Sequence, residues 1–229
     1  MDDYISILKK RNLGLTERQK LVLQFAVVAA YLASVAFAGG ATHTTIPFVG
    51  QVDLGWLYYP LAAVVIVGVV NAVNFTDGID GLNTTVSFFA FLSLALCAGL
   101  LSMTGLSAMG LASAAACIGF LIWNWHPAKV FMGDTGSLFM GGMVCALAFG
   151  MDLPLLLLPV GFVYLCEILS VVLQVTYFKA THGKRLFKMS PIHHHFEMCG
   201  WSEVKICLVF GLVALLGGAV AILCVAFGM

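Results

Sequence analysis

The segment LYYPLAAVVIVGVVNAVNFTDGIDGL, residues 57–82, joins a long apolar run to a short polar motif. Residues 57–70 are almost wholly apolar, whereas residues 71–82 hold two asparagines, two aspartates and two glycines. Ionised groups are costly in lipid and persist there mainly where they have a function. Asp and Gly are also ordinary residues of helix ends and turns. So dense a polar cluster favours a functional site where a membrane helix meets water.

The composition supports a membrane protein. The chain has 229 residues, of which 61% are hydrophobic and 10% charged, and its mean hydropathy is +1.02; a soluble domain is about 25% charged. A membrane helix needs about 20 mainly apolar residues. The sequence therefore predicts an all-α, polytopic membrane helix bundle that forms one domain over residues 1–229. It has about seven transmembrane helices, expected at Leu21–Ala38, Trp56–Asn74, Val86–Leu101, Ala108–Trp123, Leu138–Met151, Leu155–Phe178 and Val204–Phe227.

The positive charges indicate the orientation of these spans. Every Lys and Arg precedes the first span, lies in the connections after the fourth and sixth, or, as Lys205 does, stands at the start of the seventh span, while the connections 39–55, 102–107 and 152–154 contain none. By the positive-inside rule, the basic side is cytoplasmic. This places the N-terminus in the cytoplasm, the C-terminus outside, and the motif 77–81 on the cytoplasmic face. Residues 39–55, which are rich in Thr and contain Pro47 and Gly50, predict a short hairpin on the opposite side.

A second acidic motif is Gly133-Asp134-Thr135-Gly136-Ser137, which opens the fifth expected span. The N-terminus of a helix offers free backbone N–H groups and a positive dipole end, which favour phosphate. An aspartate there can be a simple N-cap. With a second acidic motif on the same face, however, carboxylates near a phosphate site predict bound Mg²⁺, which takes oxygen ligands and bridges substrate phosphates.

The tract Pro191-Ile192-His193-His194-His195-Phe196-Glu197 follows the sixth expected span. Zinc is one interpretation, but consecutive histidines project in different directions and cannot clasp one ion from one helix face. Contacts to phosphate or sugar oxygens suit histidine better near neutral pH.

Glu167 is an acid inside an apolar segment, about eleven residues before its cytoplasmic end, or about 16 Å by helical rise. It could be a proton relay in a transporter or a structural partner of another helix, and we favour the structural interpretation. A transporter predicts polar residues along several spans and internal symmetry. The other polar motifs here lie at one surface, which favours an enzyme working at the membrane interface.

Four segments, in this order, carry a resemblance to a known family: Asp2-Asp3-Tyr4, NAVNFTDGIDGL, NWHPAKVFMGDTGS and PIHHHFE. Together they resemble the phospho-N-acetylmuramoyl-pentapeptide transferases, a branch of the polyprenyl-phosphate sugar-1-phosphate transferases. The resemblance extends over essentially the whole chain, and the PIHHHFE block is specific to this branch.

The resemblance implies a Mg²⁺-dependent enzyme of peptidoglycan biosynthesis in the bacterial cytoplasmic membrane, with its active site on the cytoplasmic face. It implies transfer of phospho-MurNAc-pentapeptide from UDP-MurNAc-pentapeptide to undecaprenyl phosphate, giving lipid I and UMP. The expected partners are these two substrates and the lipid bilayer, with a homodimer expected from the family and no nucleic acid.

The resemblance also implies roles for individual residues. Asp2, Asp3 and Asp134 match catalytic aspartates, and Asn74 would hold the metal beside Asp134. Phe131 would stack on the uracil. The remaining substrate-binding positions are Asp77, Gly78, Asp80, Asn124, Gln174, His193, His194 and His195.

Members of this family carry further membrane spans, and a substrate-binding lysine, before the Asp-Asp pair. We therefore expect this chain to correspond to an N-terminally truncated member. An inactive fragment of the enzyme is the alternative to an active transferase.

Overall fold

The structure, a computed structural model, describes residues 15–37, 39 and 42–228. Its elements, in chain order, are α2 (Glu17–Phe37), β1 (His43–Ile46), β2 (Gly50–Asp53), η1 (Gly55–Leu57), α3 (Tyr58–Thr76), α4 (Leu82–Leu100), α5 (Thr104–Asn124), α6 (Gly133–Gly150), η2 (Pro154–Leu156), α7 (Leu157–Val160), α8 (Phe162–Ala180), α9 (Ile192–Met198) and α10 (Glu203–Gly228). The expected all-α membrane bundle is confirmed.

Six of the described helices are long and apolar enough to cross a membrane, namely those within Arg18–Phe37, Gly55–Thr76, Leu82–Leu100, Thr104–Asn124, Phe162–Ala180 and Glu203–Gly228. The expected fifth span, Leu138–Met151, lies within α6. That helix has 18 residues but begins with the polar turn Gly-Asp-Thr-Gly-Ser, so the count of seven spans is not confirmed.

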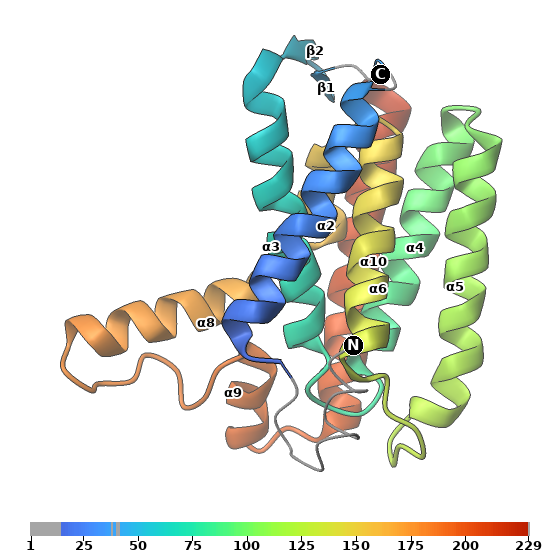
Figure 1. The fold of residues 1–229 in the computed structure, drawn as a ribbon. Helices are drawn as coiled ribbons and strands as arrows, with labels where there is room; N and C mark the ends of the chain where they lie inside the picture. Colours follow the sequence, from blue (N-terminus) through green and yellow to red (C-terminus); the bar gives the residue numbers. More distant parts are fainter. Residues whose placement is uncertain (1–14, 38, 40–41, 229) are drawn as a thin grey trace.

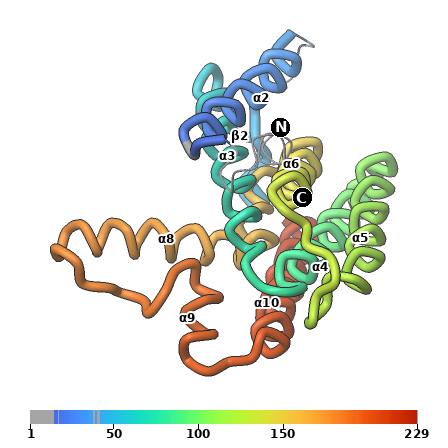
Figure 2. The backbone as a smooth tube through the Cα atoms, turned by 60° about the horizontal axis from the view of Figure 1, so that its bottom comes forward, coloured from blue at the N-terminus to red at the C-terminus, as the bar shows by residue number. Residues whose placement is uncertain are grey.

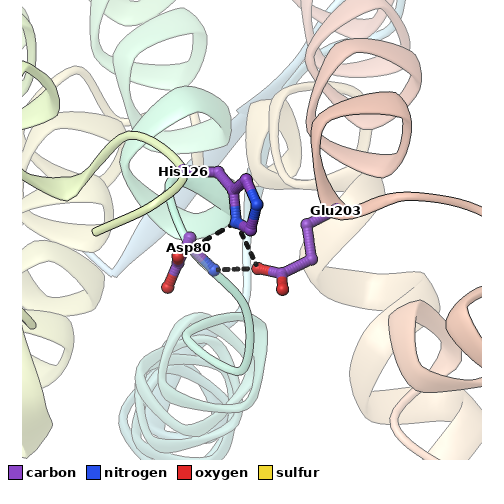
Figure 3. Close-up of side chains that lie close together, drawn as sticks. All are labelled: Asp80, His126 and Glu203. Carbon is purple, nitrogen blue, oxygen red and sulfur yellow. Dashed lines mark hydrogen bonds and ion pairs between the residues drawn. The ribbon is translucent and has the colours of Figure 1, made fainter.

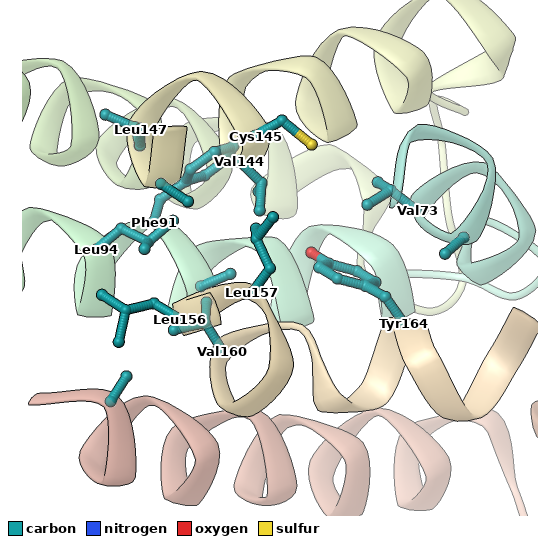
Figure 4. Close-up of a cluster of buried hydrophobic side chains, with 14 of the residues drawn as sticks. Val73, Phe91, Leu94, Val144, Cys145, Leu147, Leu156, Leu157, Val160 and Tyr164 are labelled. Carbon is teal, nitrogen blue, oxygen red and sulfur yellow. The ribbon is translucent and has the colours of Figure 1, made fainter. Parts of the chain in front are cut away.

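Except for α8, the long helices run alongside one another, and α4 lies in their midst (Figure 1). Of the residues in the apolar stretch of α4, 67% are buried inside the protein, compared with 11% for α2 and 17% for α5. Apolar side chains from α4, α6 and α7 fill the core, with Phe91, Val144 and Leu157 at its centre (Figure 4). This core fixes the helix ends on which the polar loops sit.

The expected sixth span, Leu155–Phe178, is not one continuous helix. It is divided into η2, α7 and α8, with Gly161 between the last two. Proline removes a backbone donor and glycine weakens a helix; Pro154, Pro159 and Gly161 together explain the division. After it, α8 runs across the direction of the bundle and projects away from it (Figures 1 and 2). The depth of 16 Å expected for Glu167 assumed one continuous span and stays a prediction.

The loops at the two ends of the bundle differ. The connections α3–α4 and α5–α6 lie at the same end as α9, and the β1–β2 hairpin lies at the other (Figure 1). The hairpin was predicted, and its strands pair antiparallel with Thr44 opposite Val52. The three motifs that lie in the described part of the chain, NAVNFTDGIDGL, NWHPAKVFMGDTGS and PIHHHFE, therefore gather at one end, as expected. The orientation of the chain across the membrane stays a prediction.

Candidate active site

The loop between α3 and α4 forms the centre of the site. Helix α3 ends at Thr76, and Gly81 has a φ of 74°, a left-handed conformation that allows α4 to begin at Leu82. Gly78 packs against the ring of His193 so closely that a β carbon on Gly78 would lie 2.2 Å from Nε2 of that ring. Gly81 thus permits the turn, and Gly78 permits the close approach of the His193 ring.

A cavity of about 280 Å³ opens beside this loop. It brings together seven residues predicted for the site, with Ile79 and Gly133 completing the lining: Asn74, Asp77, Gly78, Asp80, Asn124, Phe131 and Asp134. These residues come from α3, the α3–α4 loop, the end of α5, the α5–α6 loop and the start of α6. Motifs up to 60 positions apart in the sequence thus form one polar cavity at the helix ends.

Asp134 lies in the first turn of α6 and is held from two sides. Asn74 Nδ2 donates to Asp134 Oδ1 at 3.1 Å, and Lys20 Nζ donates to Asp134 Oδ2 at 2.6 Å. Asn74 also donates to Ser137 Oγ at 2.8 Å. Carboxylate and amide oxygens are ligands that Mg²⁺ accepts, and turning the Asn74 amide would present its oxygen. Asn74 and Asp134 therefore fit the predicted metal site, while their role stays a prediction.

Asp77 lies close enough to Asp134 for their charges to interact. Burial and the negative charge of Asp134 raise the pKa of Asp77 to about 6, against a smaller opposing effect of its hydrogen bond with Asn83. A carboxyl held beside a second carboxylate is a setting in which a nearby positive charge favours ionisation. A divalent ion between them would relieve this repulsion.

Asp80 is the centre of a second cluster (Figure 3). Its Oδ2 accepts from the backbone of Ala128 at 2.9 Å and lies 3.2 Å from His126 Nδ1. Its backbone N–H donates to Glu203 Oε2 at 3.1 Å, and His126 lies 3.5 Å from the same oxygen. The cluster ties the α3–α4 loop to the α5–α6 loop and to α10. Asp80, His126 and Glu203 are also close enough to hold a metal ion, so this cluster is a second candidate cation site.

Asn124 and Phe131 differ in their freedom to move. Asn124 is buried, accepts from Thr84 Oγ1 at 2.7 Å and donates to the carbonyl of Val130 at 3.0 Å. Phe131 is 74% exposed. Asn124 therefore shapes the α5–α6 loop, and the ring of Phe131 is available for a planar ligand to stack on.

Four predicted residues do not line this cavity. Gln174 was expected there, but its Oε1 accepts from the backbone of Leu186 and Phe187 at 3.0 and 2.8 Å, so it caps the loop after α8. The three histidines also lie outside the lining and have three different partners, because consecutive residues point in different directions. His193 contacts Glu167, His194 bonds with Glu197, and His195 Nδ1 accepts from the backbone of Lys188.

Asp2 and Asp3 lie outside the described residues. Sequence reasoning assigned no role to Lys20, His126 or Glu203. His126 belongs to the quoted motif NWHPAKVFMGDTGS, and Lys20 is one of the basic residues before the first span, so both carried a weak signal. Glu203 is recognisable only through its contact with the Asp80 loop.

These features define the class of protein: a multi-pass membrane protein with an acidic polar site at one end of its helices. The sequence model of glycosyl transferase family 4 matches residues 1–152. A phospho-N-acetylmuramoyl-pentapeptide transferase of Halalkalibacterium halodurans is 45% identical over 223 residues, covering 97% of this chain and 68% of that relative. The enzyme of the same name from Bacillus thuringiensis is 46% identical over 219 residues, covering 94% of this chain and 67% of the relative.

This chain belongs to the phospho-N-acetylmuramoyl-pentapeptide transferase family, within glycosyl transferase family 4. It spans about two thirds of the length of these relatives.

Proposed function

We propose that this chain transfers phospho-MurNAc-pentapeptide from UDP-MurNAc-pentapeptide to undecaprenyl phosphate, forming lipid I and UMP. The observation that carries the proposal is the cavity in which Asn74, Asp77, Asp80 and Asp134 meet beside the exposed ring of Phe131. Relatives that bear the name of this enzyme, about 45% identical over nearly the whole chain, support it. The site would face the cytoplasm, where the nucleotide substrate is made.

Asp134 and Asn74 would hold Mg²⁺, and Asp77 lies near enough to add its charge. When bound, the ion would neutralise charge on the diphosphate and on the departing UMP. The residues of the chain fit this use, because they combine oxygen donors with a carboxyl whose pKa is raised by a second carboxylate. The cluster of Asp80, His126 and Glu203 offers another set of metal ligands. In this cluster, however, backbone N–H groups already donate to the carboxylates of Asp80 and Glu203.

The remaining residues would bind and orient the substrates. Phe131 would stack on the uracil, and Asn124 would hold the loop that presents it. Lys20, which bonds to Asp134, offers a positive charge to a phosphate near the same carboxylate. Asp2 and Asp3 would position the lipid phosphate.

The reaction would be a direct displacement. An oxygen of the lipid phosphate attacks the phosphorus attached to the sugar, the bond from that phosphorus to the UMP oxygen breaks, and UMP leaves with the electron pair. The second pKa of a phosphate is about 6, so most of the lipid phosphate is already a dianion at neutral pH and needs little help from a base. The competing route forms a covalent phospho-sugar on an aspartate. Capture of such an intermediate on Asp2 or Asp3 would exclude direct displacement.

The test is UMP release by the 229-residue chain in detergent, supplied with both substrates and Mg²⁺. Release should stop on chelation of Mg²⁺ and fall on the order of 10²–10³-fold in Asp134→Asn. Asp53→Asn, which removes a carboxylate at the hairpin end, is the matched control and should keep full activity. Absence of turnover in the unmodified chain, or turnover that survives both chelation and Asp134→Asn, would refute the proposal.

A further inference from the structure

The pair formed by Glu167 and His193 is the one buried ionic contact among the described residues in which both side chains are wholly inaccessible. Both are 0% exposed, and His193 Nδ1 lies 3.1 Å from Glu167 Oε2. The contact lacks the directional geometry of a hydrogen bond. Within the described part of the chain, the carboxylate oxygens of Glu167 and the ring nitrogens of His193 have no hydrogen-bond partner. A buried charge without a partner is strongly unfavourable. Each side chain therefore depends on the other.

The two residues come from different elements. Glu167 lies in α8, which projects from the bundle, and His193 lies in the short helix α9 after a loop of eleven residues, 181–191 (Figure 2). Gln174 holds that loop to α8 further along the helix. Glu167 thus fixes α9 near the start of α8.

The opposite edge of the His193 ring supports the acidic loop. His193 Nε2 lies where a β carbon on Gly78 would be only 2.2 Å away, and Gly78 is flanked by Asp77 and lies two residues before Asp80. Close-packed interiors transmit small displacements. A ring that tilts or withdraws would therefore leave the backbone between Asp77 and Asp80 without its support.

The carboxylate also presents to the ring a hydrogen-bond acceptor, placed 3.1 Å from Nδ1. A carboxylate beside Nδ1 favours a proton on that nitrogen and fixes the orientation of the ring. A glutamine at position 167 would keep nearly the same shape but lose this preference. The charge of Glu167 and its volume can therefore be separated by experiment.

We propose that Glu167 is a positioning residue: it fixes the ring of His193, and His193 supports the acidic loop of the transferase site at Gly78. The expected effect on turnover rests on the proposed function, whereas the contact between Glu167 and His193 does not. It gives this buried acid a role other than proton transport, because its carboxylate is used to orient a neighbour.

The experiment compares Glu167→Gln with Tyr164→Phe. Tyr164 lies one turn earlier on α8, is equally buried, and hydrogen-bonds to Ser87 rather than to His193. Both variants keep the shape of a buried side chain and change one polar group. We expect kcat/KM for the UDP substrate to fall roughly 10- to 100-fold in Glu167→Gln and to stay unchanged in Tyr164→Phe, with similar melting temperatures for the two variants. Glu167→Asp, which keeps the charge, should recover part of the loss.

A second readout does not require turnover. In ¹⁵N spectra of the labelled chain, the ring nitrogens of His193, assigned with His193→Gln, and the amide of Gly78 should shift in Glu167→Gln but not in Tyr164→Phe. Adding His193→Gln to Glu167→Gln should lower activity little further, because residues that act through one contact are not additive. Unchanged His193 and Gly78 signals in Glu167→Gln would overturn the inference whether or not the chain is active. Absence of turnover in the unmodified chain would instead count against the proposed function alone.

Discussion

The two ends of the bundle are built in different ways. At the site end, side chains from separate elements bond to one another or to a distant backbone, as in Lys20 with Asp134 and Thr84 with Asn124. At the hairpin end, the long-range hydrogen bonds run between backbone groups, as from Thr45 to Asp152 and from Phe48 to Gly228. The hairpin end also exposes large apolar side chains, among them Phe48, Val49 and Trp56.

This difference shows where the chain fixes side-chain positions. A backbone hydrogen bond holds a strand or turn in place and tolerates many side chains, whereas a side-chain network specifies individual residues. Exposed aromatic side chains suit a membrane–water interface. Matched substitutions should therefore have large effects on chemistry at the site end and small effects at the hairpin end.

Among these matched substitutions, the largest effect is expected from Gly78→Ala. Its new methyl group would overlap the ring of His193 and displace the loop between Asp77 and Asp80. A misplacement of about 1 Å can lower catalysis about 10²-fold, and we expect a loss of kcat/KM of this order. Gly68→Ala is the control: Gly68 lies in α3, the helix that precedes this loop, and a β carbon added there would meet no neighbouring atom within 4 Å. Equal activity in the two variants would show that the His193 contact does not matter for the site.

A smaller effect is expected from removing an exposed aromatic ring. Phe131 and Phe48 are 74% and 70% exposed, one at each end of the bundle. If Phe131 stacks on the uracil, Phe131→Ala should weaken UMP binding roughly ten- to a hundredfold, since base–aromatic stacking contributes ~1–3 kcal/mol.

Phe48→Ala should bind UMP as the unmodified chain does. Calorimetric titration with UMP in detergent measures both variants under the same conditions. Equal affinities for Phe131→Ala and the unmodified chain would mean that the base is recognised elsewhere in the cavity.

The sequence predicted most of the fold, because apolar runs interrupted by polar motifs are a strong signal for membrane helices. It missed the division of residues 154–161, since a proline or glycine inside an apolar run is tolerated in many membrane helices. The meeting of Asn74 with Asp134 was expected from the family motifs, and the structure brings them into contact. Neither composition nor spacing could reveal that Gln174 turns toward the 186–187 backbone.

The sequence also could not predict which distant residues contact the motifs. Glu203 is 123 residues from Asp80, and Lys20 is 114 residues from Asp134. Such pairings depend on how the helices pack, and single charged residues near span ends are common. Glu167 was noticed from the sequence as a buried acid, but its partner could be named only once α9 had been placed under the Gly78 loop.

The smallest effect expected concerns pH, and it contrasts one aspartate at each end. Burial and Asp134 raise the pKa of Asp77 to about 6, whereas hydrogen bonds from Thr42 and from the Gly55 backbone lower the pKa of Asp53. Because the pKa of folded Asp77 is above its ordinary value, the folded state favours protonated Asp77, and that contribution to stability is lost as the pH rises through about 6. A divalent cation beside Asp134 favours the ionised form.

Cation binding should therefore strengthen as the pH rises from about 5 to 7, by less than about tenfold, because at most one proton is displaced from Asp77. Titration of Mn²⁺ followed by electron paramagnetic resonance would measure the slope of cation affinity against pH. The slope should disappear in Asp77→Asn and persist in Asp53→Asn, whose carboxyl is already ionised throughout this range. If Asp77→Asn kept the full slope, another group at the site end would have to carry the proton, and the raised pKa of Asp77 would have no part in cation binding.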